Sequence, residues 1–265
     1  VASYGNGGIP SANGSLLPGA QVVAGFKPTD AGHYDRHSYS GYVDLEADLT
    51  DKFSVGLAGR TESYSDFGDT SNGKVSLRYA FTPKIALRAT ASTGFRAPSL
   101  QQQFFQSIAT NFINVTQPGG GVLAVPFEIG TFRTDNPAAI ALGAEPLKAE
   151  ESENYGLGLV LQPVDNLYVT VDAYRIDIAD RIVLSENLTS VPVRNYLQAN
   201  GFPGIGGGRY FTNAVDTKTT GIDVVGTYNL ALASSNVALT AGYNYNKTEI
   251  EKIAANPDAL EAIDP

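Results

Sequence analysis

Apolar and polar residues alternate with a period of two along most of the chain from residue 38 onward. Between residues 38 and 50, one set of alternate positions is apolar and the other is acidic: Val43, Leu45, Ala47 and Leu49 against Asp44, Glu46 and Asp48. Successive side chains of a β-strand point to opposite faces, so this pattern predicts a strand with one apolar and one polar face. Similar segments follow it and predict about eight strands of roughly 10–14 residues, arranged as four hairpins.

The predicted strands are joined by connections that alternate between short and long. Short turns are expected at residues 50–52, 82–84, 163–166 and 231–235, and polar or irregular loops at 65–73, from the end of the fourth strand to residue 148, and at 181–208. We also expect a β-bulge near Tyr174, because Ile176 and Ile178 are out of phase with the apolar residues before them. Transmembrane barrels combine short turns on one side with long loops on the other, whereas a soluble β-sandwich has no reason to do so.

Composition supports an all-β protein with an apolar surface. Only 17% of the residues are charged, against roughly 25% in average soluble chains, and the chain holds 28 Gly, 14 Tyr and 12 Phe. It has no continuous run of about 18 apolar residues, which a transmembrane helix needs and a membrane barrel does not. The net charge of −9 argues against nucleic acid as a partner, and the absence of cysteine excludes disulfides and thiolate metal sites.

Four stretches of the sequence resemble segments of the β-barrel region of TonB-dependent outer-membrane receptors. They are LAGRTESYSDFGDTSNGKVSLRYAFTP (57–83), LRATASTGFRAPSLQQQF (87–104), LKAEESENYGLGL (147–159) and VDAYRIDIADRI (171–182). They occur in the order that the family has. Ala149 stands where Pro is usual and Gly156 where Glu is usual, and neither departure changes the assignment.

The resemblance implies an antiparallel transmembrane β-barrel segment in the bacterial outer membrane, with residues 1–265 forming part of a single barrel domain. Receptors of this family also have a signal peptide, a plug domain and about 22 strands, so we expect the chain to be an internal fragment. The implied function is energised uptake of a scarce solute of the siderophore, cobalamin or glycan class. The implied partners are outer-membrane lipid, the receptor's own plug domain and the TonB complex. A soluble β-structured binding or adhesion module and a passive outer-membrane pore remain alternatives.

The candidate functional residues are charged side chains that alternate with the apolar ones. A charged residue facing lipid costs about 2–4 kcal/mol near the membrane midplane, so these residues should face the barrel lumen. There they would line a substrate path, contact a plug, or neutralise one another in an ion-pair network. The predicted lumen-facing residues are Asp44, Glu46, Asp48, Arg60, Glu62, Lys74, Arg78 and Arg88.

A second candidate feature is the corner formed by Gly94, Phe95, Arg96 and Pro98. Proline cannot donate a hydrogen bond to a sheet and disfavours helix in the residue before it, so strand pairing should end here. Phe95 occupies a position suited to an interfacial aromatic residue, and Arg96 is a potential donor to carboxylates or lipid phosphates. We expect this corner to be part of the barrel rim.

The sequence offers no positive sign of catalysis, of a cofactor or of a metal. His33 and His37 are spaced as a metal pair on a helix would be, but they lie in a loop without a third ligand nearby. The segment Gly204–Arg209 is glycine-rich like a phosphate-binding loop, yet it lacks the Lys-Ser/Thr pair that such a loop requires, so a flexible loop is expected. The sequence contains no Gly-x-Ser-x-Gly motif and no other arrangement typical of an enzyme.

Overall fold

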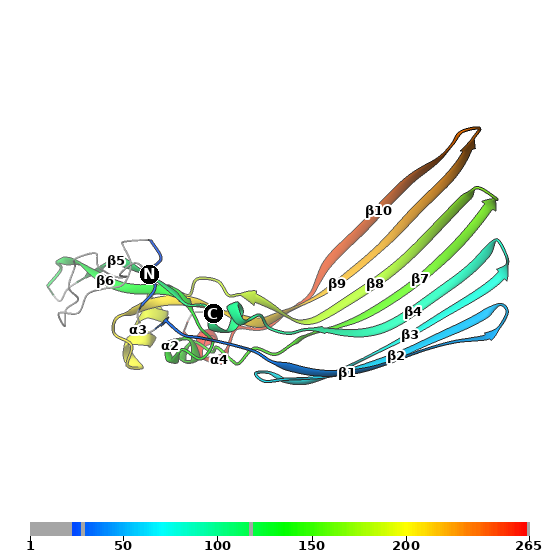
Figure 1. Ribbon diagram of the computed structural model, residues 1–265. Coiled ribbons are helices and arrows are strands. Elements are labelled where there is room, and N and C mark those ends of the chain that lie inside the picture. The colour runs from blue at the N-terminus through cyan, green and yellow to red at the C-terminus, as the bar shows by residue number, and fades with distance from the viewer. Residues whose placement is uncertain (1–22, 28–29, 117–118, 264–265) are drawn as a thin grey trace.

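The computed structural model describes residues 23–27, 30–116 and 119–263. Within these residues, eight long strands form a curved antiparallel sheet (Figure 1). They are β1 (Ser38–Thr50), β2 (Phe53–Tyr64), β3 (Gly68–Thr82), β4 (Ile85–Arg96), β7 (Glu150–Val164), β8 (Leu167–Leu184), β9 (Ile205–Leu232) and β10 (Ser235–Ile253). Each neighbours the next along the chain, so the sheet consists of four consecutive hairpins and is open between β1 and β10. The predicted fold class is confirmed.

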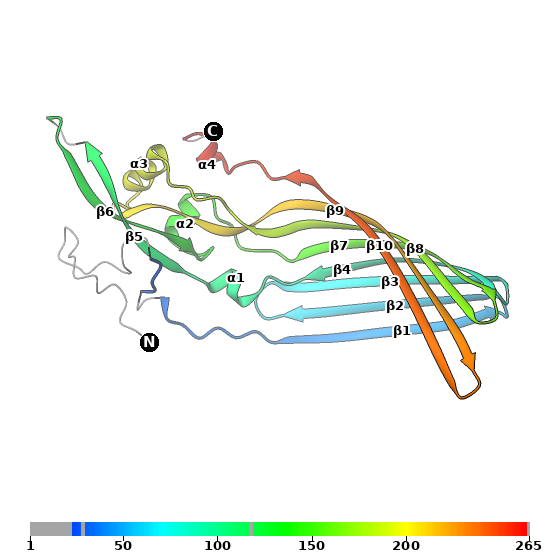
Figure 2. The ribbon, with the colours of Figure 1, turned by 90° about the horizontal axis from the view of Figure 1, so that it is seen from above.

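The four hairpin turns lie together at one end of the sheet, and the long connections lie at the other (Figures 1 and 2). Each turn is two residues long: 51–52, 83–84, 165–166 and 233–234. The loop predicted at residues 65–73 is wrong, because β3 already begins at Gly68. Residues 68–73 pair with residues 59–64 of β2, since backbone hydrogen bonds between strands do not require apolar side chains.

Pairing register sorts the side chains of the long strands onto two faces. Leu45, Leu57 and Val75 lie opposite one another in neighbouring strands, and Asp44, Ala58 and Lys74 do the same one residue away. One surface, the apolar face, therefore carries most of the aliphatic and aromatic residues of the long strands. The other surface, the polar face, carries most of the charged residues of the long strands, together with Ser, Thr, Asn and Gly. Leucines of the apolar face such as Leu45 and Leu157 are more than half exposed, which is unusual for a folded chain surrounded by water.

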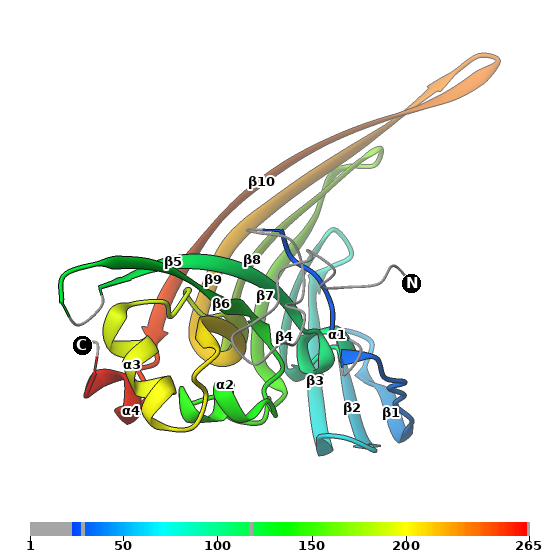
Figure 3. The ribbon, with the colours of Figure 1, turned by 90° about the vertical axis from the view of Figure 1, so that its left-hand side faces the viewer.

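The long connections fold into a compact unit, the head, made of residues 100–116, 119–144, 185–210 and 257–263 (Figure 3). It contains α1 (Leu100–Phe104), β5 (Ser107–Thr116), β6 (Val122–Phe132), α2 (Pro137–Ala141), α3 (Val191–Ala199) and α4 (Asp258–Glu261), together with the start of β9. β6 pairs in parallel with residues 205–210 of β9. The connection between β4 and β7, which we expected to be a loop of about 50 residues, therefore contributes two helices and an extra hairpin.

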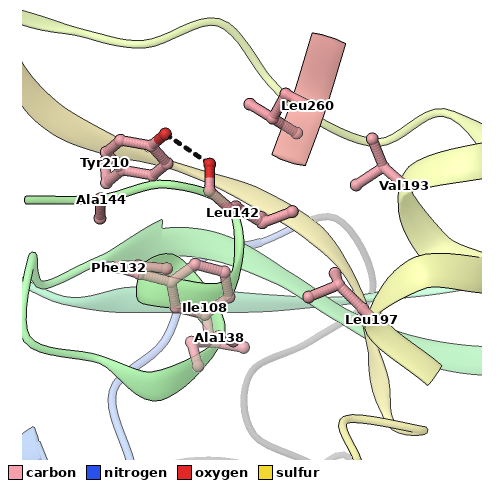
Figure 4. Packing of buried hydrophobic residues seen from close by; sticks show 10 residues of the cluster. Ile108, Phe132, Ala138, Leu142, Ala144, Val193, Leu197, Tyr210 and Leu260 are labelled. Carbon is pink, nitrogen blue, oxygen red and sulfur yellow. Dashed lines mark hydrogen bonds between the residues drawn. The ribbon is translucent and has the colours of Figure 1, made fainter. Parts of the chain in front are cut away.

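An apolar core holds the head together (Figure 4). It consists of Ile108, Phe132, Ala138, Ala139, Leu142, Ala144, Val193, Leu197, Tyr210 and Leu260. The Tyr210 hydroxyl donates a hydrogen bond of 2.8 Å to the Leu142 carbonyl, so this buried polar group is satisfied. These residues come from two connections (β4–β7 and β8–β9), from the start of β9 and from the segment after β10. They follow no sustained period, which is why the sequence pattern does not reveal them.

Two local predictions are corrected by the backbone. The β7–β8 pairing runs unbroken past Tyr174, and the irregularity of β8 lies instead around Asp180, whose φ is 54°. Ile176 and Ile178 consequently point to the polar face. The glycine-rich segment is a buried start of β9, not a flexible loop: a side chain on Gly208 would collide with Phe132.

Candidate functional site

All eight predicted charged residues lie on the polar face. In register, Asp44 is opposite Ala58 and then Lys74, Glu46 is opposite Gly56, and Arg78 is opposite Arg88. Residues at every second position of a strand share its face, which places Asp48, Arg60 and Glu62 there as well. The structure thus brings the predicted set together on one surface, and in the part of the chain that it describes that surface is open.

The polar face has two shallow hollows. The first, of about 360 Å³, is lined by Glu46, Asp48, Gly56, Arg78 and Arg88 among others. The second, of about 380 Å³, is lined in part by Asp44, Arg60 and Lys74. Both lie over the small residues of β2. A side chain at Gly56 would collide with the Ser76 hydroxyl, so the depth of the first hollow depends on this glycine.

Opposite charges face each other across these hollows without touching. Asp44, Glu46 and Asp48 are on β1, whereas Lys74 and Arg78 are on β3. Two strand spacings separate the backbones of the two rows by about 10 Å. Among the described residues, none of these five side chains has a hydrogen-bond or ion-pair partner, so the two rows are free to bind a partner that carries charges of both signs.

One ion pair on this face spans a whole strand. Arg88 of β4 donates two hydrogen bonds to Asp172 of β8, with Nε–Oδ1 2.9 Å and Nη2–Oδ2 2.6 Å. Gly158 of the intervening β7 lies beneath them, and a Cβ there would come within 2.6 Å of Arg88 Nε. The sequence prediction did not include Asp172. It alternates with the apolar residues Val171 and Ala173, and this pattern could have assigned it to the polar face together with Arg88.

A second ion pair lies closer to the head. Arg60 pairs with Glu62 on the same strand, and the Tyr64 hydroxyl donates a 2.8 Å hydrogen bond to the other oxygen of Glu62. The Glu62 side chain is buried by these neighbours. Both carboxylate oxygens are therefore occupied, and Glu62 serves this local pair.

The corner predicted at residues 94–98 joins the sheet to the head. Arg96 pairs with Glu150 through both of its oxygens; the Nε–Oε2 distance is 2.9 Å. The Arg96 side chain is 60% exposed, but that of Glu150 is only 5% exposed. Glu150 also accepts a 2.8 Å hydrogen bond from the backbone N–H of Ile182. A carboxylate is thus the partner of Arg96, and Glu150 ties β4, β7 and β8 together.

Arg36 links the other side of the corner. Its guanidinium makes hydrogen bonds of 2.6–3.0 Å to Asp66 and one of 2.6 Å to the Pro98 carbonyl. It also lies over the rings of Tyr64 and Phe67, at 5.7 and 5.2 Å from their centres. Arg36, Asp66, Tyr64, Phe67 and the Pro98 carbonyl are together called the rim latch below.

Aromatic packing and electrostatics reinforce the rim latch. Phe95 contacts the Tyr64 ring edge-on, with ring centres 5.8 Å apart. Burial alone would raise the pKa of Asp66, but hydrogen bonds from Arg36 and Gln103 outweigh it and hold that pKa below its usual value. The rim latch therefore keeps Asp66 charged to a lower pH than an ordinary aspartate.

Within the residues that the structure describes, no group of three or more acidic or histidine side chains is arranged to hold a metal ion. Nor does that part of the chain contain a helix long and apolar enough to cross a membrane.

Comparison with known proteins agrees with this geometry. The family model described as "TonB dependent receptor-like, beta-barrel" matches residues 2–262. No curated protein sequence is similar enough to count as a match.

Several solved structures have the same fold. The siderophore receptor PirA from Pseudomonas aeruginosa aligns with a TM-score of 0.55 and 16% identity, over 82% of this chain and 35% of its own. The ferric enterobactin receptor PfeA from the same organism aligns with a TM-score of 0.51 and 18% identity, over 82% and 27%. The RagAB peptide transporter aligns with a TM-score of 0.55 and 17% identity, over 82% and 23%. The chain thus matches only 23–35% of the length of these proteins.

Proposed function

The chain belongs to the family of TonB-dependent receptor β-barrels, and from this premise we propose that it supplies part of the wall and of the capture loops of an outer-membrane receptor for energised solute uptake. The observation that carries the proposal is the two-faced sheet with a folded head at one end. The apolar face would contact lipid and the polar face would line the lumen. The head, at the end opposite the tight turns, would be the extracellular surface that first meets the solute.

The dimensions of the apolar face support a membrane position. On β10 it runs from Val237 to Tyr245, which is eight residue steps or about 27 Å along the strand. A tilt of about 40° reduces this to a height of about 21 Å, near the roughly 25 Å of apolar surface in outer-membrane barrels. Tyr243 and Tyr245 stand at the head end of this band, where aromatic girdles occur.

The two rows of opposite charge on the polar face suggest what fills the lumen. A plug domain or a solute that carries both signs of charge would satisfy Asp44, Glu46 and Asp48 on one side, and Lys74 and Arg78 on the other. The proposed solute belongs to the siderophore, cobalamin or glycan class. The structural neighbours add peptides to this range, since one of them is a peptide transporter.

The test is uptake by the receptor that contains this chain. Cells producing it would be supplied with a radiolabelled ferric siderophore, cobalamin, an oligosaccharide or a peptide, in strains with and without TonB. We expect uptake of one class, and only in the strain with TonB. Uptake that persists without TonB would identify a passive pore, and recovery of the protein in the aqueous fraction without detergent would identify a soluble binding module; either result contradicts the proposal.

A further inference from the structure

The outer edge of β5 in the head carries a row of backbone groups without partners. β5 is the last strand in the order of its sheet and pairs with β6 on one side. Ile108 turns its backbone away from β6, because its N–H donates to the Gly25 carbonyl at 2.8 Å and its carbonyl accepts from the Gly25 N–H at 2.7 Å. Such residues alternate along an antiparallel strand, so the backbone groups of Phe112, Asn114 and Thr116 point the same way. Among the described residues, none of these six groups has a hydrogen-bond partner.

β5 also lacks the features that usually protect a strand edge. Natural edges carry Lys, Pro, a bulge or a covering segment, because an unpaired edge recruits other strands. β5 contains no Pro, no Gly and no charged residue, and it is ten residues long. It pairs with β6 without a register shift, so no bulge twists its edge away. The strand therefore presents a regular, uncharged edge.

The opposite edge of the same hairpin is protected. The Glu128 N–H of β6 points away from β5, because it donates to the Gly204 carbonyl at 2.9 Å. By the same alternation residue 126 faces outward on that side, and this residue is a proline, which has no N–H to donate. The β6 edge is thus blocked at the position that corresponds to the open positions of β5.

Pairing at the β5 edge already begins within the chain. Gly25 and Ile108 form an antiparallel bridge, which has the geometry of a β-ladder. Beyond Thr110 the edge continues for six residues, 111–116, or about 20 Å. In Figure 2 the ends of β5 and β6 extend beyond α3. The edge therefore accepts an extended backbone at one end and leaves room for another beside it.

The side chains next to this edge indicate what kind of strand would fit. Ile113 lies opposite Val125, and Val115 lies opposite Leu123, so the four share one face of the hairpin. Leu123 is 54% exposed. Residues 107–127 contain no charged side chain. A strand beside β5 would place every second side chain on this aliphatic patch, which favours apolar residues at alternate positions.

We propose that residues 111–116 of β5 are a docking edge for an extended peptide, which adds a strand to the head through backbone hydrogen bonds. A peptide repeats its N–H and C=O groups every two residues, and this repeat matches the spacing along β5. Apolar residues at alternate positions of the peptide would contact the aliphatic patch. The assignment of this peptide to an imported solute rests on the proposed function; the strand-accepting edge does not.

The test is binding of a peptide probe to the receptor that contains this chain, folded in detergent micelles. The probe is acetyl-KTVTVTV-amide carrying fluorescein, and the control is the same peptide N-methylated at every residue, which cannot donate backbone hydrogen bonds. Binding is measured by fluorescence polarisation, and hydrogen exchange of segment 107–116 by mass spectrometry. We expect the probe to bind saturably and to slow this exchange, and the methylated control to bind at least about tenfold more weakly.

A matched pair of variants tests the edge itself. The Asn114 N–H points away from β6, so Asn114→Pro should leave the hairpin paired while removing one outward donor. It should weaken probe binding at least about fivefold, because one hydrogen bond is lost. Asn114→Ala keeps the backbone N–H and should bind the probe as the wild type does.

Several outcomes contradict the proposal. Equal binding of the probe and its methylated control, or exchange that the probe leaves unchanged in the wild type, overturns it even if Asn114→Pro does not fold. Protection of segment 107–116 before the probe is added also overturns it. Such protection would show pairing with a second copy if it rises with protein concentration, and with another part of the receptor if it does not. Probe binding without peptide uptake would contradict only the assignment to a solute, whereas TonB-dependent uptake without probe binding would contradict only the docking edge.

Discussion

Reversing the character of two adjacent residues on β2 tests the assignment of the two faces. Leu57 lies on the apolar face, opposite Leu45 and Val75, whereas Ala58 lies on the polar face, opposite Asp44 and Lys74. The two positions are about 3.4 Å apart along the strand and so share nearly the same membrane depth. Arginine at either position adds the same charge and the same length. Any difference between Leu57→Arg and Ala58→Arg therefore reports the face and not the depth.

The structure sets the expected size of the difference. Leu57 is four residues beyond the start of β2 at Phe53, or about 14 Å along the strand and about 10 Å in height at a 40° tilt. This is close to the middle of an apolar band about 25 Å tall, where lipid-facing arginine costs about 2–4 kcal/mol. The equilibrium constant of folding should therefore fall by about 30- to 700-fold. At position 58 the neighbouring Asp44 attracts the new charge and Lys74 repels it, so we expect a change below about 1 kcal/mol.

The assay is folding of the receptor that contains this chain into lipid vesicles over a urea series. Folded and unfolded forms are separated by their different gel mobility before heating, and Leu57→Ala controls for loss of the leucine side chain. Equal tolerance of the two arginines would refute the assignment of the apolar face to lipid. Greater damage from Ala58→Arg would indicate a soluble sandwich whose small residues pack into a dry core.

Three further substitutions test contacts described above. Arg96→Ala should cost about 1–3 kcal/mol in urea unfolding, because it leaves the buried Glu150 carboxylate with fewer donors, and Arg96→Lys should recover part of this; no change would mean that the pair contributes nothing. Gly158→Ala, which pushes apart the cross-strand ion pair, should cost less than about 1 kcal/mol because that pair is partly exposed, and a larger loss would show that β7 itself is distorted. The pKa of Asp66 is lowered in the folded state, so its pair with Arg36 contributes its full stability above the unfolded pKa near 3.9 and loses it as pH falls through the lower folded pKa. Asp66→Asn should therefore remove this acid sensitivity from unfolding curves measured between pH 6 and 2. A variant that keeps the sensitivity would exclude Asp66 as its source.

The alternation of residue types was sufficient to predict the hairpins and the two faces, because each strand expresses both in its own sequence. Val43 and Asp44, or Leu57 and Ala58, are assigned to opposite faces without knowledge of any neighbour. The tight turns follow for the same reason: the pattern stops for only a few residues and then resumes. The eight predicted charges lie on one face because strand period and pairing register agree.

Features that depend on contacts between distant segments could not be predicted in this way. The head core joins Ile108 and Leu142 of the β4–β7 connection to Val193 of the β8–β9 connection, and the local patterns of these connections do not show a common face. The role of Gly158 requires knowing that Arg88 and Asp172 lie on the strands to either side of it. The bulge near Tyr174 was predicted on the assumption that an apolar residue such as Ile176 avoids the polar face. Near the head end of the strands this assumption does not hold, and Ile176 lies on the polar face.

Residues that pair across neighbouring strands form rows, and the position of charged residues in these rows is evidence that the strands are tilted in the membrane. No single strand shows this. One row runs from Leu57 through Val75, Ala91 and Tyr155 to Arg175, always on the same face. If the strands stood upright, Arg175 would share the depth of Leu57 and meet hydrocarbon at a cost of about 2–4 kcal/mol. At a tilt of about 40°, four strand spacings of about 4.8 Å raise Arg175 by about 12 Å, half the height of the band. Distance from the turns gives nearly the same answer: Leu57 is four residues from the start of β2 and Arg175 is eight from the start of β8, a difference of about 10 Å in height. The charge of Arg175 is therefore placed at the interface by the register, where it pairs with Asp177, and its presence on the apolar face supports a tilted membrane sheet.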